Sequence, residues 1–248
     1  MRVIAITSGK GGVGKTFFSV NLATALTKLG KSVTLIDANF TTPNTALISG
    51  YLTFFNTIHD FLSERINDIS KVIYKTSYGF KIVPGSIDLN SMIDARIERF
   101  NLFLEKIKDE FIILDTAAGI GREAISSIMN SKEIIIVVNP EISSIIDAKR
   151  VIEVCNKIDK KILALVANRI SKKEDVKKIE KYLNLEVNLI LPEDKRVKDS
   201  IEKRIPFIEL YPSSYIASQI LNFASYLSGE LYEFKPNLFE RIKYSFYL

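Results

Sequence analysis

Eight consecutive residues near the start of the chain have the composition of a phosphate-binding loop. Residues 9–16 read Gly-Lys-Gly-Gly-Val-Gly-Lys-Thr and match the pattern G-x-x-x-x-G-K-[ST]. Glycines let successive backbone N–H groups converge on phosphate oxygens, and a following helix adds a favourable dipole. We expect Lys15 to bridge the β- and γ-phosphates of a nucleotide and the Thr16 hydroxyl to bind Mg²⁺. The candidate nucleotide-binding residues here are Gly11, Gly12, Val13, Gly14, Lys15, Thr16 and Phe17.

Two aspartates at the ends of apolar runs are candidate magnesium ligands. Asp115 follows residues 111–114, and Asp37 ends residues 32–37. A carboxylate at the carboxyl edge of a strand beside a phosphate-binding loop is suited to hold Mg²⁺ through its bound water. For Asp37 the alternative is a helix cap at the strand end. Gly119, in the loop after Asp115, would let a backbone N–H approach the γ-phosphate closely.

The elements that must position these residues alternate between short apolar runs and longer segments of helical period. Runs typical of strands cover residues 2–7, 32–37, 80–83, 111–114, 134–138, 162–167 and 187–191. Segments typical of helices cover residues 16–29, 96–108, 142–157 and 174–183. Several strand runs are apolar on both faces, which is typical of central strands in a covered parallel sheet. The sequence therefore predicts a doubly wound α/β fold, with a mainly parallel sheet and helices on both faces.

A lysine at the second position of the loop gives the motif a further meaning. Lys10-Gly-Gly-Val-Gly-Lys15-Thr resembles the deviant Walker A loop of the MinD/ParA family of P-loop ATPases. The resemblance implies that Lys10 reaches the phosphates of the partner in a homodimer that sandwiches two ATP molecules. It also implies ATP, ADP and Mg²⁺ as ligands, and a catalytic role for Lys10, Lys15 and Asp115. Residues 2–229 share the resemblance, and archaeal MinD-like proteins are the most similar branch.

The first of two switch segments departs from the family pattern. Residues 37–44 read Asp-Ala-Asn-Phe-Thr-Thr-Pro-Asn, whereas the family commonly has Asp-x-Asp at the start. Asn39 therefore stands where the second carboxylate would position the attacking water. An amide can hydrogen-bond to water but cannot accept its proton. We therefore expect ATP hydrolysis to be slow, and a nucleotide-binding scaffold with negligible turnover is one alternative function.

Later motifs extend the resemblance to the base of the nucleotide. Asn168 and Arg169 end a predicted strand where the family places an adenine-contacting Asn, although a single Asn there can equally be a turn residue. Pro192, Glu193 and Asp194 resemble the loop that covers the base. These five residues complete the predicted nucleotide site.

Composition limits the other chemistries open to this chain. One cysteine and one histidine in 248 residues exclude a disulfide framework, a Cys-rich zinc module and a His-based metal centre. The net charge of +5 is compatible with nucleic acid or an anionic membrane as partner. A DNA-binding partition ATPase thus stays open as an alternative. The basic residues considered for DNA are Lys160, Lys161, Arg169, Lys172, Lys173, Lys177, Lys178 and Lys181.

We divide the chain into an ATPase domain, residues 1–230, and a tail, residues 231–248. Pro236 can begin a helix in which Leu238, Phe239, Ile242 and Phe246 share one apolar arc. Glu240, Arg241, Lys243 and Ser245 lie off that arc. An isolated helix of about three turns is unstable in water, so we expect it to form on an anionic membrane. The alternative is a tail packed on its own domain or on a dimer partner.

The sequence thus predicts a MinD-like switch that binds membrane reversibly and positions a partner, at the division site or with another spatially placed cargo. No apolar run approaches the ~18 residues of a membrane-spanning helix. We expect a cytoplasmic protein that lies on the inner face of the cell membrane in its ATP state. The protein partner and any activator are not identified by the sequence.

Overall fold

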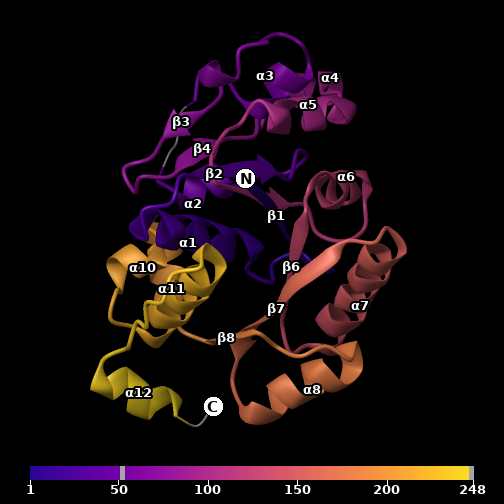
Figure 1. Cartoon of the computed structure of the whole chain (residues 1–248). Coiled ribbons are helices and arrows are strands. Elements are labelled where there is room, and N and C mark those ends of the chain that lie inside the picture. Colours follow the sequence, from indigo (N-terminus) through magenta and orange to yellow (C-terminus); the bar gives the residue numbers. More distant parts are fainter. Residues whose placement is uncertain (51–53, 246–248) are drawn as a thin grey trace.

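A twisted sheet of eight strands runs through the centre of the molecule (Figure 1). The computed structural model describes residues 1–50 and 54–245, so Phe246 of the expected apolar arc lies outside the described residues. The strands are β1 (Arg2–Thr7), β2 (Val33–Ala38), β3 (Tyr74–Lys75), β4 (Lys81–Val83), β5 (Phe111–Thr116), β6 (Glu133–Val138), β7 (Lys161–Ile170) and β8 (Leu189–Pro192). Their order is β3-β4-β2-β5-β1-β6-β7-β8.

The sheet is parallel except at one edge, where β3 pairs antiparallel with β4. β1 lies between β5 and β6. Strands β2 to β5 lie on one side of β1 and strands β6 to β8 on the other, so the direction in which strands are added reverses at β1. Ligands of doubly wound sheets bind at the carboxyl ends of the strands beside such a point. The predicted mainly parallel α/β fold is therefore confirmed, with β3 as an addition.

Helices cover both faces of the sheet (Figure 1). The α-helices are α1 (Lys15–Lys28), α2 (Thr45–Ile48), α3 (Ile58–Leu62), α4 (Leu89–Asp94), α5 (Phe100–Glu105), α6 (Arg122–Asn130), α7 (Ile142–Lys157), α8 (Lys173–Leu183), α9 (Arg196–Lys203), α10 (Phe207–Leu210), α11 (Tyr215–Ser228) and α12 (Leu238–Tyr244). Two short 3₁₀ helices are η1 (Ile69–Lys71) and η2 (Ile97–Arg99). The helix predicted over residues 96–108 is thus shorter, because η2 precedes α5 and residues 106–108 are outside it.

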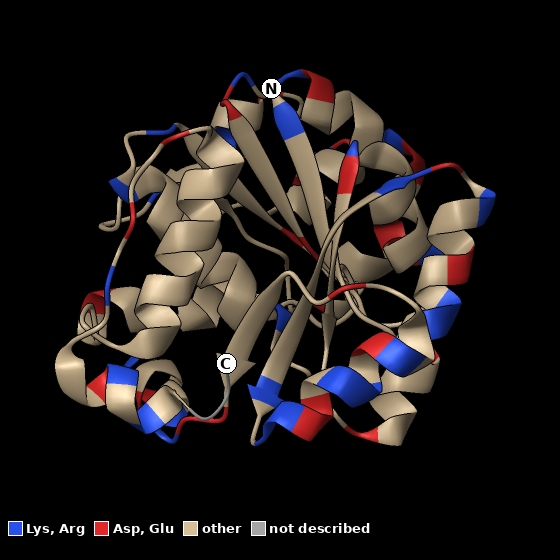
Figure 2. Cartoon of the chain, turned by 60° about the horizontal axis from the view of Figure 1, so that its bottom comes forward, with Lys and Arg blue, Asp and Glu red and all other residues tan. Residues whose placement is uncertain are grey.

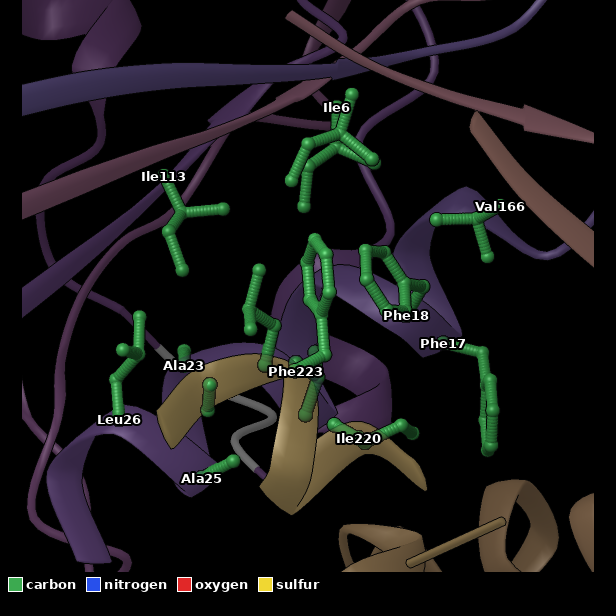
Figure 3. Close-up of a cluster of buried hydrophobic side chains, with 14 of the residues drawn as sticks. Ile6, Phe17, Phe18, Ala23, Ala25, Leu26, Ile113, Val166, Ile220 and Phe223 are labelled. Atoms are coloured by element: carbon green, nitrogen blue, oxygen red, sulfur yellow. The ribbon is translucent and has the colours of Figure 1, made fainter. Parts of the chain in front are cut away.

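Alternation along the strands divides the core into two clusters. In β1, Ile4 and Ile6 face α1, α10 and α11, whereas Val3 and Ala5 face the side of α3, α5, α6, α7 and α8. Figure 3 shows Phe18 of α1 and Phe223 of α11 packed under Ile6 in the first cluster. Each buried side chain of this size contributes about 1.5–3 kcal/mol. This packing fixes α1, and with it the phosphate-binding loop, against the sheet.

Candidate functional site

The phosphate-binding loop joins the end of β1 to the start of α1, as its sequence predicts. Gly12 and Gly14 have φ angles of 75° and 101°, which side-chain-bearing residues rarely adopt. A Cβ on Gly14 would also lie 2.3 Å from Nδ2 of Asn168. That amide donates a hydrogen bond to the carbonyl oxygen of Val13 at 2.7 Å. Asn168, predicted to contact adenine, therefore braces the loop from β7.

Lys15 lies at the base of the loop and is almost fully buried. Its ammonium group donates a hydrogen bond to Oγ of Ser8 at 3.0 Å. Burial lowers the pKa of Lys15, and the nearby charge of Asp115 opposes this shift. Ser8 was not among the predicted site residues, because the phosphate-loop pattern starts one position later. An ammonium held this way is in place to exchange a neutral hydroxyl for a phosphate oxygen.

Asp37 and Asp115 are brought side by side by the sheet, because they are paired residues of the adjacent strands β2 and β5. Asp37 is fully buried, and its carboxylate accepts backbone N–H groups of Asn44 and Thr45 at 2.8 and 2.9 Å. Burial and then the charge of Asp115 raise the pKa of Asp37 to about 7. A buried acid whose ionisation is opposed by burial and by a neighbouring carboxylate is a suitable environment for a cation.

Asp115 is held by two hydroxyl groups. Ser19 Oγ and Thr45 Oγ1 donate to its carboxylate at 3.2 and 2.9 Å. Burial raises the pKa of Asp115, whereas the Thr16 side chain, the charge of Lys15 and these two hydroxyl donors lower it. Nearby, Thr16 Oγ1 donates to Oδ1 of Asn44 at 3.1 Å. Thr45 was missed in the sequence, where it has no motif to mark it.

The three candidate metal ligands supply oxygen atoms, which is the donor chemistry that Mg²⁺ prefers. Within residues 1–50 and 54–245, no group of three or more His, Cys, Asp or Glu side chains is arranged to hold a metal ion. The oxygen donors of Thr16, Asp37 and Asp115 fit a Mg²⁺ that takes its other ligands from nucleotide phosphates and water.

The first switch segment, residues 37–44, is hydrogen-bonded to helix α6. Asn39 uses its amide Nδ2 to bind the carbonyl oxygen of Thr42 at 2.7 Å. The backbone N–H and the hydroxyl of Thr41 both donate to the carboxylate of Glu123, with 3.2 Å for the N–H. Glu123 lies in the first turn of α6 and was not predicted. Among the described residues lining the cavity below, Glu123 is the one carboxylate.

A cavity of about 730 Å³ lies over the loop and the ends of β2 and β5. Most predicted loop residues line it, together with Asn39, Arg169 and the unpredicted Glu123 and Ile201. Val13 is instead buried, and Phe17 also packs edge-on against Phe207 of α10, with ring centroids 5.8 Å apart. The cavity has the size of a small-ligand pocket.

Lys10, expected at the partner's phosphates, and Gly119, expected at the γ-phosphate, have other partners in this structure. Lys10 is exposed, and its Nζ donates to Oγ of Ser143 in α7 at 3.0 Å. The backbone N–H of Gly119, at φ 82°, donates to the carbonyl oxygen of Ser8 at 2.8 Å. Both contacts would have to be exchanged before these groups could reach a phosphate.

The residues predicted to contact or cover the base lie largely outside the cavity. Arg169 lines the cavity, and its Nε lies 4.0 Å from the carboxylate of Glu193. Pro192 ends β8, but neither it, Glu193 nor Asp194 lines the cavity. Asp194 turns toward α12, where it accepts hydrogen bonds from Arg196 and Tyr244. Its carboxylate is therefore engaged in a contact that the sequence did not predict.

The comparisons with known proteins agree with this geometry. The model of the CobQ/CobB/MinD/ParA nucleotide binding domain matches residues 4–207. An uncharacterized ATP-binding protein of Methanocaldococcus jannaschii is 38% identical over 235 residues, which cover 93% of this chain and 89% of that protein. The septum site-determining protein MinD of Pyrococcus horikoshii, solved with Mg-ADP, is 30% identical with a TM-score of 0.85, and the match covers 91% of this chain and 95% of that one.

A second similar structure is the MinC:MinD cell division complex of Aquifex aeolicus. The matching chain is 36% identical with a TM-score of 0.81, and the match covers 94% of this chain and 98% of that one. The matched residues contain the phosphate-binding loop, Asp37, Asp115 and Asn168 described above. The chain therefore belongs to the CobQ/CobB/MinD/ParA nucleotide-binding domain family, and within it to the MinD/ParA ATPases.

Proposed function

We propose that this chain is a Mg²⁺–ATP-dependent switch of the MinD type. ATP binding would bring two copies together around two nucleotides, attach them to a membrane through their tails and position a protein partner. Hydrolysis to ADP and phosphate would release them. The Mg-ADP complex of the Pyrococcus protein and the MinC:MinD complex of the Aquifex protein support the ligand and the type of partner.

The contrast between the two loop lysines carries this proposal. Lys15 is buried and points into its own site, whereas Lys10 is exposed and its ammonium rests on Ser143 outside the cavity. A lysine in the same loop that does not serve its own cavity is available to a second copy of the chain. We therefore propose that Lys10 crosses to the partner's phosphates in the dimer.

Light scattering with a non-hydrolysable ATP analogue tests the dimer. Lys10→Ala should bind nucleotide as the wild type does but stay monomeric, because its Nζ touches only an exposed hydroxyl in the single chain. Lys28→Ala, at the far end of α1, removes the same charge and should still dimerise. Equal dimer fractions for Lys10→Ala and wild type would contradict the role of Lys10 in the partner's site.

We propose that the tail attaches the protein to the inner face of the cell membrane in its ATP state. Within the described part of the chain, no helix has both the length and the apolar character needed to cross a membrane. Co-sedimentation with anionic liposomes, in ATP analogue and in ADP, tests the attachment. Removing residues 236–248 should abolish pelleting in the analogue. Pelleting that persists after the deletion would overturn the membrane proposal.

Non-specific DNA binding is the second candidate, but the structure gives several of the basic residues other partners. Lys160 donates to carbonyl oxygens of Met129 and Ser131, and Lys161 pairs with Glu133. Figure 2 shows acidic segments interleaved with the basic ones along α8. DNA co-sedimentation that falls steeply with salt, and survives the tail deletion, would favour this candidate.

A further inference from the structure

The tail helix α12 is docked on the body of the molecule by its polar side. Glu240 and Tyr244, one turn apart, are 3% and 1% exposed, whereas Leu238, Phe239 and Ile242 are 69%, 74% and 62% exposed. At 100° per residue, the two buried positions lie opposite the three apolar ones. The usual arrangement of an amphipathic helix on its own protein is thus reversed.

Four side chains form the contact, which we call the tail latch: Asp194, Arg196, Glu240 and Tyr244. Arg196 lies between the two carboxylates, with Nη2 at 2.6 Å from Asp194 and at 2.9 and 3.0 Å from the two oxygens of Glu240. The hydroxyl of Tyr244 donates to Asp194 at 3.0 Å. The two carboxylates are buried and share one half-buried guanidinium, which hydrogen-bonds to both of them. Buried ion pairs stabilise a fold when their remaining hydrogen-bonding atoms are satisfied in this way.

The tail latch also completes the start of another helix. Glu240 accepts the backbone N–H of Tyr215, the first residue of α11, at 3.0 Å. A carboxylate at this position is favoured by the positive end of the helix dipole. The ring of Tyr244 packs on that of Tyr215, with centroids 5.1 Å apart. Asn237 caps α12 itself by accepting the N–H of Glu240 at 2.9 Å.

The outward side of α12 has the chemistry of a lipid-facing surface. Arg241 and Lys243 are exposed and fall on opposite flanks of the apolar ridge formed by Leu238, Phe239 and Ile242. Cations beside an apolar ridge meet lipid phosphates while the ridge enters the acyl boundary. Figure 1 places α12 at one end of the molecule, away from the sheet.

We infer that α12 is a pre-formed membrane-binding foot, which the tail latch holds in its helical form and whose apolar ridge binds an anionic bilayer while the latch stays closed. The inference rests on the proposed membrane attachment and specifies how it works. A free seven-residue segment would have to order its backbone on the membrane. The docked helix has already done so, so lipid binding retains more of its free energy.

The experiment compares the two sides of α12 by vesicle binding and by amide hydrogen exchange. Vesicles of phosphatidylglycerol and phosphatidylcholine are added to the full chain with a non-hydrolysable ATP analogue. Ile242→Glu should abolish vesicle binding yet leave α12 amides as protected as in the wild type, since the Ile242 side chain is largely exposed. Arg196→Ala should speed exchange in α12 without vesicles, and should weaken vesicle binding about 10-fold.

Two controls sharpen this comparison. Lys198→Ala removes the same charge from the same helix α9, but Lys198 pairs with Glu202 and not with the tail, so both readouts should stay unchanged. Tyr244→Phe keeps the ring and removes one hydrogen bond, and should speed α12 exchange less than Arg196→Ala does.

The outcomes separate this inference from the proposed function. If wild type never binds vesicles, membrane attachment fails, and the inference fails with it even where the exchange pattern confirms the latch. If wild type binds and Arg196→Ala binds equally or more tightly, the latch does not present the foot and the inference alone is overturned. Unchanged hydrogen exchange of α12 in Arg196→Ala would also overturn the inference. So would dimerisation without lipid that Ile242→Glu abolishes, because the apolar ridge would then bind a second copy of the chain.

Discussion

Two pairs of buried carboxylates in the described part of the chain are stabilised in different ways. Asp37 and Asp115 are hydrogen-bonded to backbone N–H groups and hydroxyls, and the pKa of each is raised. Asp194 and Glu240 have Arg196 between them. Burial by itself would raise the pKa of Asp194, but the hydrogen bonds of Arg196 and Tyr244 hold that pKa below its usual range.

The difference distinguishes a ligand-binding site from a structural contact. Leaving two acids without a full counter-charge costs stability, and such a cost is usual where a cation or substrate binds. In the tail latch Arg196 makes direct ion pairs with both carboxylates, whereas Lys15 acts on Asp115 through its nearby charge, so the latch is complete without a ligand. The same residue types thus have different roles because of what the fold places between them.

Removing the ammonium group of Lys15 should have the largest effect on nucleotide affinity. Lys15→Ala should weaken Mg²⁺–ATP binding on the order of 100-fold, because one charge-assisted contact to the phosphates is lost. Calorimetry measures the affinity, and Lys28→Ala, on the exposed end of α1, is the matched control. Unchanged affinity in Lys15→Ala would remove the basis for assigning this loop to phosphate.

The raised pKa of Asp37 predicts that replacing this carboxylate stabilises the protein in a pH-dependent way. Folding raises the pKa of Asp37 to about 7, so the protonated form stabilises the nucleotide-free fold at low pH. This contribution is lost as the pH rises from about 4 toward 7. Asp37→Asn should therefore be more stable than wild type by about 1–3 kcal/mol at pH 8, with little difference at pH 4.

Urea unfolding of the nucleotide-free protein at the two pH values measures this effect. The same variant should bind Mg²⁺–ATP more weakly, because an amide is a poorer partner for a cation than a carboxylate. A variant that is less stable than wild type at pH 8 would show that the carboxylate of Asp37 is structural, as that of Asp194 is.

Restoring the family's carboxylate tests the hydrolytic part of the site. Asn39→Asp should raise kcat by about 10-fold, the lower range for a placed catalytic group. Steady-state phosphate release measures the rate, with Mg²⁺–ATP affinity as the check that binding is unchanged. If wild type is already as fast as the variant, Glu123 is the residue to replace next, since its carboxylate lines the same cavity.

The tail latch should respond to acid in a different window from Asp37. Because folding lowers the pKa of Asp194, its contribution is present above about pH 4 and is lost as the pH falls through the lower folded value. Amide protection of α12, corrected for intrinsic exchange, should be constant from pH 7 to 5 and fall a few-fold below pH 4. Loss of protection between pH 7 and 5 would mean that another group controls docking.

Local spacing was enough to predict the loop, the parallel sheet and the placement of Asp37 and Asp115. Strands that are apolar on both faces, and a glycine-rich turn between a strand and a helix, leave few alternatives. The predicted helix over residues 142–157 coincides with α7 for the same reason, because its apolar spacing is carried by local sequence.

The surroundings of those residues were decided by the tertiary structure. Nothing near Glu123 in the sequence marks it as a partner of Thr41, because Thr41 follows β2 and Glu123 lies 82 residues later in α6. Asp194 was expected to cover the base of the nucleotide. It instead faces the tail, where Arg196 and Tyr244 donate hydrogen bonds to its carboxylate.

The tail shows this division most clearly. The apolar arc and the helix starting near Pro236 follow from the sequence, whose 3.6-residue period puts Leu238 and Ile242 together. The sequence also led us to expect a helix that forms on a bilayer, with Glu240 off the apolar arc, and left a tail packed on its own domain as the alternative. The structure forms α12 without a bilayer, because Arg196 and the N–H of Tyr215 bind Glu240 from segments distant in sequence. Periodicity determines which residues share a face, whereas the fold determines which face is buried.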